Sequence, residues 1–336
     1  MLVTYVRSSS YNNYSYCQMQ YYMTYVLGHQ TVSGKKAQLG TIVHKVMECL
    51  ARCKEALQNK KRTTVDDALG KLPVSKKKLY SKDFVNDLLD QSFEYYTSTC
   101  VHDYTEGDKK TCRKWVWMAI EYNGGQFDPR ERKIVAPEPH FDIEIDRPWA
   151  KFDYTLPSGE KVTGNLAIKG TIDLVTEVAD GVIEVVDWKT GKRVDWATGE
   201  EKDYEKLSTD PQLLLYYYAI SKLFPQYEQA IMSIFYIRDG GPFSLCYDIS
   251  DQEYFLDKLK TRFLQIKNNM SPKPISYTQT HWKCKRLCDY AKKDWGDSGK
   301  SMCGYVHDML KKDGIEKTTA ECTKEGFQIG YYEAPG

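Results

Sequence analysis

Two opposite charges stand at the end of an apolar run in the stretch EVVDWKTGK, residues 184–192. Val185 and Val186 predict a buried strand, and Asp187 and Lys189 follow at its end. Side chains two residues apart on a strand point to the same face, so this carboxylate and this ammonium are expected to lie side by side. A carboxylate can hold a hard divalent cation, and an ammonium can stabilise developing negative charge or orient an attacking water. The question is whether this pair carries out chemistry or is only a salt bridge at the end of a core strand.

A second carboxylate precedes this strand, in GTIDLVTEV, and the loop between the two strands decides how the carboxylates relate. A two-residue Asp-Gly turn would pair Ala179 with Val182 and would send Asp173 and Asp187 to opposite faces. A three-residue loop with its glycine in the left-handed conformation would pair Val178 with Val182. The two aspartates would then lie directly opposite each other. Both loops remain open from the sequence.

Two carboxylates that face each other repel, and burial strengthens the repulsion, so such a pair destabilises the fold unless something compensates the charge. A cation between Asp173 and Asp187 would remove it, and oxygen ligands suit Mg²⁺ or Mn²⁺. The alternative is that both aspartates are exposed residues at strand ends and that Lys189 is only their salt-bridge partner.

Two predicted helices carry further polar pairs one turn apart. In GTIVHKVME these are His44 and Glu48, for which a solvated helix face is the favoured place of Glu48. In PQLLLYYYAI they are Gln212 and Tyr216, with Pro211 in the first turn. The residue before that proline, Asp210, or its neighbour Thr209, is expected to cap the second helix.

Taken in order, these pieces form a helical G-x-x-x-H, a strand G-x-x-D, a strand D-W-K-T-G and a helical Q-x-x-x-Y, between residues 40 and 216. This series resembles the PD-(D/E)XK nuclease superfamily, and most closely its RecB-like branch, which includes the AddB nuclease domain and the CRISPR-associated exonucleases. The resemblance implies an α/β fold of the restriction-endonuclease type, with a mixed central sheet flanked by helices.

The resemblance also implies a role for each matching position. His44, Asp173 and Asp187 correspond to metal ligands for Mg²⁺ or Mn²⁺, and the backbone carbonyl of Trp188 completes the site. Asp187 stands where many relatives have glutamate, which the RecB-like branch permits.

The other matching positions correspond to catalytic residues of the family. Lys189 corresponds to the catalytic lysine, and Gln212 and Tyr216 correspond to residues that position DNA and water. Asp173 and Asp187 are catalytic in the same sense, through the metal that they hold.

Cysteines form the last pattern. The C-terminal stretch has Cys284 and Cys288 with three residues between them, then Cys303, and Cys17 lies far upstream. The layout resembles the AddB type, in which one cysteine before the nuclease core and three after it ligate a 4Fe–4S cluster. Four thiolates suit such a cluster or a structural Zn²⁺.

The gap before Cys303 is longer than the family leads us to expect, so Cys322 and His281 are rival ligands. Free thiols are the remaining alternative for these tail cysteines. The other cysteines are interpreted as packing residues: Cys49, Cys53, Cys100, Cys112 and Cys246.

The elements that must position these residues follow from hydrophobic periodicity. Helices are predicted at residues 8–27, 40–58, 82–99, 109–123, 210–223 and 251–268, and strands between 133 and 188 and at 230–237 and 243–248. Residues 59–81 are expected to form a polar loop with a short helical piece, and the tail from 271 is expected to be irregular.

The predicted organisation is a single RecB-like nuclease domain over residues 1–336. Its parts are N-terminal helices carrying Cys17 and His44 (1–53), a helical insertion (54–130), the core sheet and helices (131–270) and a Cys-rich metal-cluster tail that closes onto an N-terminal helix (271–336).

Composition sets limits on the class of protein. The chain has 336 residues, 41% of them hydrophobic and 28% charged, with a formal net charge of +1. It has no apolar run of the length that a membrane span needs and no recognisable secretory signal, so we expect no membrane partner and a cytoplasmic location, in a bacterium or in the host cell of a virus. Ten cysteines without a signal also favour a reducing compartment.

The expected function is that of a metal-dependent deoxyribonuclease, an exonuclease on DNA ends or single strands in recombination, repair or replication. No Walker-A motif is present, which favours a stand-alone nuclease, as from a virus or mobile element, that works with recombination or replication proteins. One rival is a structure-specific or restriction-type endonuclease on the same fold. Others are a catalytically silent DNA-binding subunit of a recombination complex and a structural zinc protein.

Overall fold

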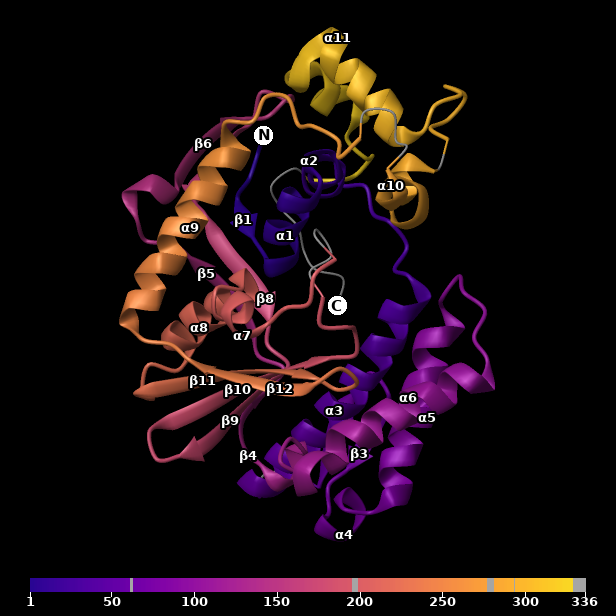
Figure 1. The fold of residues 1–336 in the computed structure, drawn as a ribbon, viewed down its shortest axis with the longest axis vertical. Helices are drawn as coiled ribbons and strands as arrows, with labels where there is room; N and C mark the ends of the chain where they lie inside the picture. The colour runs from indigo at the N-terminus through magenta and orange to yellow at the C-terminus, as the bar shows by residue number, and fades with distance from the viewer. Residues whose placement is uncertain (61–62, 195–198, 277–280, 293, 329–336) are drawn as a thin grey trace. The chain divides into compact units, whose positions relative to one another are not determined.

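The computed structural model describes residues 1–336 except 61–62, 195–198, 277–280, 293 and 329–336. The chain forms two compact units (Figure 1). Unit 1 consists of Met1–Val32, Phe141–Gly170 and Asp251–Gly336, and unit 2 consists of Ser33–His140 and Thr171–Ser250. Helices flank mixed sheets, so the predicted α/β class is confirmed. The division into 1–53, 54–130, 131–270 and 271–336 within one nuclease domain stays a prediction.

The centre of unit 2 is a five-stranded sheet with the order β12-β11-β10-β9-β4. The strands are β4 (Lys133–Pro137), β9 (Leu174–Ala179), β10 (Val182–Lys189), β11 (Gln229–Tyr236) and β12 (Gly241–Cys246). β10 and β11 are parallel and the other neighbours are antiparallel, so the sheet is mixed. β10 has neighbours on both sides, and six of its eight residues are buried, as is typical of a central strand.

Helices of unit 2 lie on both faces of this sheet (Figure 1). On one face are α3 (Lys35–Asn59), α5 (Lys82–Ser98) and α6 (Glu106–Glu121), whose apolar residues pack with Val186 and Trp188 of β10. On the other face is α8 (Pro211–Leu223), which follows the short α7 (Tyr204–Ser208). Alternation along β10 sends Val186 and Trp188 toward the first group and therefore Asp187 and Lys189 toward α8.

The β9–β10 connection combines the two loops that the sequence left open. Ala179 pairs with Val182, as a two-residue turn requires, and Gly181 has a positive φ of 70°. The register then shifts by one residue, because Ile183 pairs with Glu177 and leaves Val178 as a β-bulge. The pairing continues to Val186 with Leu174, so the bulge places Asp173 and Asp187 at opposing positions after all.

Residues 59–81 are more ordered than the predicted loop. They contain a hairpin of β2 (Thr64–Asp67) and β3 (Gly70–Pro73), followed by α4 (Lys76–Leu79). Polar composition concealed the hairpin because only Val65 and Leu72 of its strands reach the core. Its last β2 residue, Asp67, is instead anchored by charge to α3.

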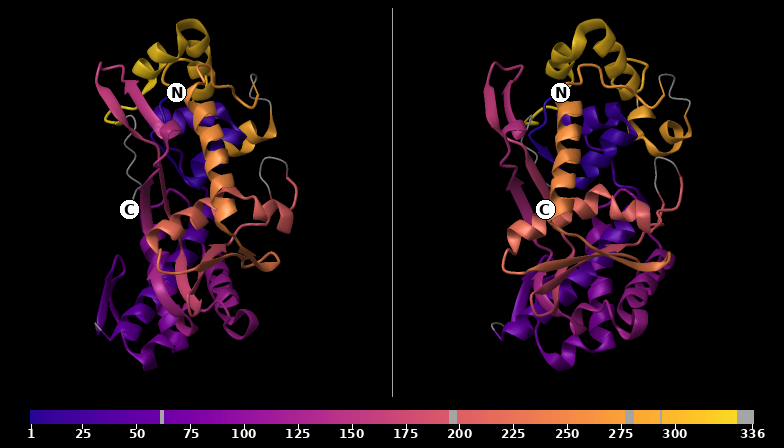
Figure 2. Two further views of the ribbon diagram at one scale, coloured as in Figure 1. Left: turned by 90° about the vertical axis from the view of Figure 1, so that its left-hand side faces the viewer. Right: turned by 60° about the vertical axis from the view of Figure 1, so that its left-hand side comes forward.

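Unit 1 contains a three-stranded sheet with the order β1-β8-β5 and a separate β6–β7 hairpin. The strands are β1 (Tyr5–Val6), β5 (His140–Glu144), β6 (Lys151–Thr155), β7 (Lys161–Asn165) and β8 (Ala167–Thr171). The helices are α1 (Ser8–Tyr16), α2 (Gln18–Tyr21), a π-helix (Tyr22–Val26), α9 (Ile249–Lys267), α10 (Trp282–Leu287) and α11 (Met302–Cys322). Both views in Figure 2 show the β6–β7 hairpin and α11 at the same end of this unit.

The sequence suggested an irregular tail, and this prediction is wrong. Two helices, α10 and α11, occupy much of the tail. The pattern was hidden by Gly314, which interrupts α11 at a positive φ of 77°. The remaining short turns are 3-10 helices at Tyr122–Gly124, Pro129–Glu131, Pro148–Ala150 and Asp289–Ala291.

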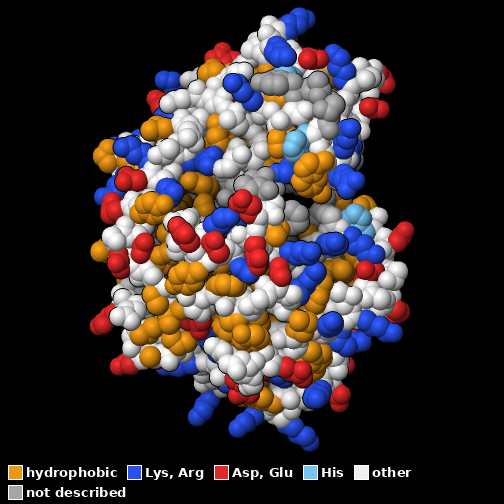
Figure 3. Space-filling model, in the orientation of Figure 1, with side chains coloured by type: hydrophobic (Ala, Val, Ile, Leu, Met, Phe, Trp, Pro, Cys, Tyr) orange, Lys and Arg blue, Asp and Glu red, His pale blue; other side chains and the backbone are white. Residues whose placement is uncertain are grey.

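Within the described residues, no helix combines the length and the apolar composition of a membrane span. The face drawn in Figure 3 carries Lys and Arg side chains interspersed with Asp and Glu, in keeping with a net charge of +1. The net charge of the chain therefore does not indicate where a functional site lies.

Candidate functional site

The end of β10 brings the predicted catalytic charges together. The Lys189 ammonium donates a hydrogen bond to Asp187 Oδ1 at 2.9 Å and lies 2.6 Å from Oδ2. Asp173, opposite, accepts a hydrogen bond at Oδ2 from the Trp188 backbone N–H at 2.8 Å. Only 2% of Asp187 is exposed. The alternative of exposed strand-end aspartates is therefore wrong for Asp187.

The two carboxylates differ in their affinity for a proton. Burial raises the pKa of Asp187 to about 6, against the opposing effect of Lys189. Burial also acts on Asp173, but the nearby His44 outweighs it and holds the pKa of Asp173 below its ordinary value. Burial disfavours the charged form of Lys189, yet Asp187 and Asp173 together raise the pKa of its ammonium. Two carboxylates, an ammonium and an imidazole thus influence one another's pKa at the end of β10.

His44 reaches this point from α3. Its Nδ1 lies 3.2 Å from Asp173 Oδ1, and about a third of the side chain, 34%, is exposed. Burial lowers the tendency of the imidazole to protonate, but the Asp173 carboxylate reverses this and raises the pKa of His44. The structure thus places the predicted His44, Asp173 and Asp187 around one point of unit 2.

Gln212 and Tyr216 join the same network from α8. Gln212 Nε2 donates to Asp187 Oδ1 at 3.1 Å and to the Tyr216 hydroxyl at 2.9 Å. The Tyr216 hydroxyl donates to the Thr171 carbonyl at 2.8 Å, and only 6% of the residue is exposed. Tyr216 therefore reaches the carboxylates through Gln212. The cap of α8 is Asp210, whose Oδ1 accepts from the Gln212 N–H at 2.9 Å, so the first of the two predicted caps is confirmed.

Neighbouring side chains lie so close to the backbone at Gly40 and Gly170 that they explain the glycines in two of the motifs. A Cβ added at Gly40 would lie 2.7 Å from Thr190 Oγ1, so the helix that carries His44 can approach the residue after Lys189 only without a side chain here. In unit 1, a Cβ at Gly170 would lie 2.5 Å from the Phe141 ring. Thr190 was missed from the sequence, although the D-W-K-T-G motif contains it.

Replacing Gly40 with alanine is expected to lower nuclease activity by about tenfold to a hundredfold without lowering stability. The added methyl group pushes α3 and His44 away from Thr190, and small misplacements of catalytic groups have effects of this size. Alanine also favours the helix over glycine. The measurements are the cleavage rate and the thermal midpoint.

Two further variants test this account. Thr190→Ala in the Gly40→Ala background removes the clashing hydroxyl and should restore activity. Gly34→Ala, at a position where an added Cβ meets nothing within 4 Å, should leave activity unchanged. A double variant as inactive as Gly40→Ala would show that the contact is not the cause.

Glu48 is not on a solvated face, contrary to the prediction, since only 8% of it is exposed. Its oxygens accept hydrogen bonds from Lys45 Nζ at 3.1 and 2.9 Å and from Arg52 Nη1 at 3.2 Å. Both cations also bind Asp67 of the β2–β3 hairpin. The hairpin, which the sequence concealed, thus buries this turn of α3.

The donor chemistry of the site fits a hard divalent cation, since carboxylate oxygens and an imidazole are ligands that Mg²⁺ and Mn²⁺ accept. Asp187 Oδ2 is buried and accepts no hydrogen bond of acceptable geometry from the described residues, although the Lys189 ammonium is near. As the side chains lie, no three His, Cys, Asp or Glu groups of the described chain are arranged to hold a metal ion. Asp173 and Asp187 instead bind His44 and Lys189 directly. The Trp188 carbonyl stays a prediction.

The four predicted cluster cysteines lie around one small pocket of unit 1. The residues that line it include Cys17, Cys284, Cys288 and Cys303. Burial raises the pKa of the Cys303 thiol to about 12, and the other three cysteines add to the effect. The N-terminal helices and the tail therefore contribute cysteines to one pocket, although no three of the described cysteines are arranged to hold a metal ion as the side chains lie. The metal cluster stays a prediction.

The rival ligands are not part of this lining. Cys322 Sγ contacts Met309 Sδ at 3.6 Å, and His281 caps α10 by accepting from the Lys283 N–H at 3.2 Å. Among the cysteines interpreted as packing residues, Cys49, Cys53 and Cys112 are buried and Cys100 is intermediate. Cys246 is exposed, so that interpretation is wrong for it, because it faces outward on the edge strand β12.

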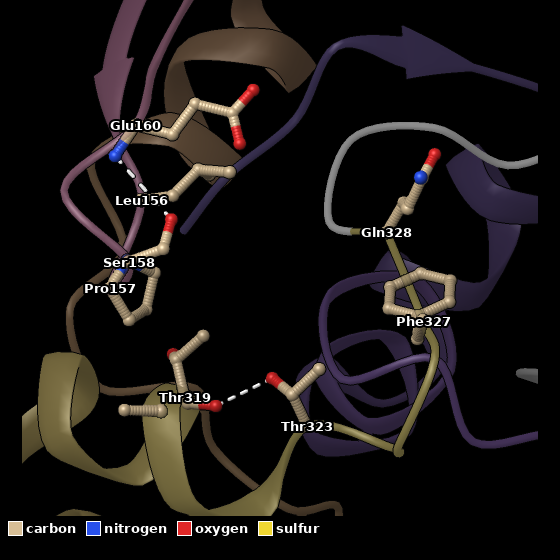
Figure 4. A pocket seen from close by; sticks show the side chains of 9 residues that line it. Leu156, Pro157, Ser158, Glu160, Thr319, Thr323, Phe327 and Gln328 are labelled. Atoms are coloured by element: carbon tan, nitrogen blue, oxygen red, sulfur yellow. Dashed lines mark hydrogen bonds between the residues drawn. The ribbon is translucent and has the colours of Figure 1, made fainter.

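A larger pocket lies elsewhere in unit 1 (Figure 4). Leu156, Pro157, Ser158 and Glu160 of the β6–β7 turn line one side, and Figure 4 shows residues from the end of α11 and beyond on the other: Thr319, Thr323, Phe327 and Gln328. Glu160 is the single ionisable group in the described lining. The pocket contains none of the predicted site residues.

Comparisons with known proteins address the family to which the chain belongs. The family model of the PD-(D/E)XK nuclease superfamily matches residues 8–292. A crystal structure described as a "Putative exonuclease" from Eubacterium rectale is similar over 84% of this chain and 88% of that one, with 11% sequence identity and a TM-score of 0.47. No curated protein sequence matches the chain.

Proposed function

Because the chain belongs to the PD-(D/E)XK nuclease superfamily, we propose that it is a metal-dependent exodeoxyribonuclease acting on DNA ends or single strands. Members of this superfamily are phosphodiesterases that act on DNA and typically use Mg²⁺ or Mn²⁺. Exonuclease action is supported by the resemblance of the four motifs to the RecB-like branch. The same resemblance supports a role in recombination, repair or replication. The cytoplasmic location stays a prediction from the sequence.

The observation that carries this proposal is the convergence of His44, Asp173, Asp187 and Lys189. The three potential ligands and the ammonium come from α3, from the residue before β9 and from β10, and His44 and Asp173 are 129 positions apart in the sequence. A chance set of motifs has no reason to meet in this way. The convergence thus supports a catalytic site over a silent DNA-binding subunit or a structural zinc protein.

Each side chain has a defined task in this proposal. His44, Asp173 and Asp187 would hold the cation, with the Trp188 carbonyl as a further ligand. The bound cation would supply an activated water and stabilise charge on the phosphate. Lys189 would donate to a phosphate oxygen or to the attacking water. Gln212 would orient Asp187 or the water, and Tyr216 would hold Gln212 in place.

The pocket of four cysteines supports a second cofactor in unit 1. We propose that Cys17, Cys284, Cys288 and Cys303 hold a 4Fe–4S cluster, with a structural Zn²⁺ as the alternative, because four thiols suit either. A group of this kind would tie α1 and α2 to α10 and α11.

The test of the function uses anaerobically purified wild-type protein with Mn²⁺ on end-labelled linear DNA and on closed circular DNA. We expect the linear DNA to be degraded and the circle to be spared. Cutting of the circle would instead identify an endonuclease on the same fold. Binding of DNA without cleavage of either substrate would refute the proposed activity.

A further inference from the structure

Arg193 and Lys202 connect the two ends of the segment that follows β10. The Lys202 N–H donates to the Arg193 carbonyl at 3.0 Å, and the Arg193 guanidinium donates to the Lys202 carbonyl. Arg193 is held by the β11–β12 hairpin, because its N–H donates to Asp239 Oδ2 at 2.7 Å and its guanidinium lies 4.6 Å from the centre of the Phe243 ring. The backbone of Lys202 is therefore fixed to the central sheet of unit 2.

The side chain of Lys202 reaches the start of α8. Its ammonium donates to Asp210 Oδ2 at 2.5 Å. The other oxygen of this carboxylate, Oδ1, caps α8 by accepting from the Gln212 N–H at 2.9 Å. Only 6% of the Asp210 side chain is exposed, against 24% of Lys202. A carboxylate buried to this degree is costly without a cationic partner, and Lys202 is that partner.

The capped residue, Gln212, is also the one that contacts the predicted metal ligands. Its Nε2 donates to Asp187 Oδ1 at 3.1 Å and to the Tyr216 hydroxyl at 2.9 Å. A shift in the first turn of α8 would move this amide away from Asp187. The contacts therefore run from Lys202 through the cap of α8 to the amide that faces Asp187.

A second ion pair of the same segment provides a contrast. Lys206 Nζ lies 2.7 Å from Glu200 Oε2, but 42% and 64% of these side chains are exposed. Exposed pairs contribute little to stability. The Lys202–Asp210 pair differs because its carboxylate is buried and caps a helix that reaches the site.

We propose that Lys202 is a positioning residue of the nuclease site, which fixes the first turn of α8 through Asp210 and so directs the Gln212 amide at Asp187; this rests on the proposed function. Lys202 acts only through these neighbours and touches no reacting group. Its loss should therefore lower the catalytic rate and leave the binding of DNA unchanged.

The test measures single-turnover cleavage of end-labelled linear DNA with Mn²⁺, at a temperature at which circular dichroism shows each variant to be folded. Lys202→Met should lower the maximal rate by about tenfold to a hundredfold, the effect of a small misplacement of a catalytic group. The DNA concentration that gives half of the maximal rate should not change. Lys202→Arg keeps the charge and should retain most of the wild-type rate. Lys206→Met, the matched control, should cleave at the wild-type rate.

Two double variants identify the route of the effect. Asp210→Asn in the Lys202→Met protein should recover most of the lost rate, because asparagine caps a helix as well as aspartate does and carries no charge. Lys202→Met in the Gln212→Ala protein should cause no further loss, because the residue through which Lys202 acts is already absent. An equal further loss in that protein would overturn the inference.

The remaining outcomes separate this inference from the proposed function. A wild-type rate in Lys202→Met would overturn the inference and leave the proposed function in place. If Lys202→Met does not fold, the double variant with Asp210→Asn becomes the test, and a folded but inactive double variant would overturn the inference. A wild type that cleaves no DNA would overturn the proposed function and this extension together.

Discussion

Lys189→Met is expected to lower the rate of DNA hydrolysis by about a hundredfold to a thousandfold, the usual effect of removing one group that stabilises developing charge. The ammonium lies 2.9 Å from Asp187 Oδ1 and is 30% exposed, so it borders both the ligands and the space open to substrate. Methionine retains most of the chain length and loses the charge. The measurement is single-turnover cleavage of end-labelled linear DNA with Mn²⁺.

Cation binding distinguishes a catalytic role of Lys189 from a purely structural one. Removing a positive charge beside Asp187 should leave Mn²⁺ affinity equal or higher, although the catalytic rate falls. Lys192→Met, at an exposed position of the following loop, is the matched control and should cleave at the wild-type rate. If Lys189→Met also cleaved within about twofold of wild type, Lys189 would have no part in catalysis.

Cys284→Ser is expected to remove the proposed cluster and to destabilise unit 1 by several kcal/mol, because a structural four-thiolate site can contribute on the order of 10 kcal/mol. The wild type, purified anaerobically, should be brown and contain iron and sulfide, and the variant should be colourless. Metal content, visible absorbance and the unfolding midpoint are the measurements.

The matched control is Cys322→Ser, which removes a buried thiol that contacts Met309 outside the cysteine pocket. It should retain the full metal content, even if its stability falls through the loss of packing. A colourless wild type that contains zinc would replace the cluster with Zn²⁺. A wild type without any bound metal would eliminate the cofactor proposal for these cysteines.

Local patterns in the sequence were sufficient to predict the helices and the strand that carry the site. The helical period predicted α3 and α8, and the residues before Pro211 left Asp210 or Thr209 as the cap. The structure has Asp210, whose short acidic side chain accepts the N–H of Gln212. The spacing of Asp187 and Lys189 on one strand predicted their contact because alternate residues share a face. Each of these relations spans only a few residues, so the backbone period determines it.

Tertiary structure decided what depends on residues that are distant in the chain. The bulge at Val178, and not the turn alone, placed Asp173 opposite Asp187, and the pairing with β10 sets that register. Burial of Glu48 required a hairpin whose anchor, Asp67, is charged and so left no apolar signal.

The sequence by itself thus determined which residues are candidates for chemistry, through the motifs from Gly40 to Tyr216 and the four cysteines. Only the folded chain decided which charges lie next to one another and how deeply they are buried. The physical reason is that charge interactions depend on distance and burial in space. Neither quantity can be read from spacing along the chain.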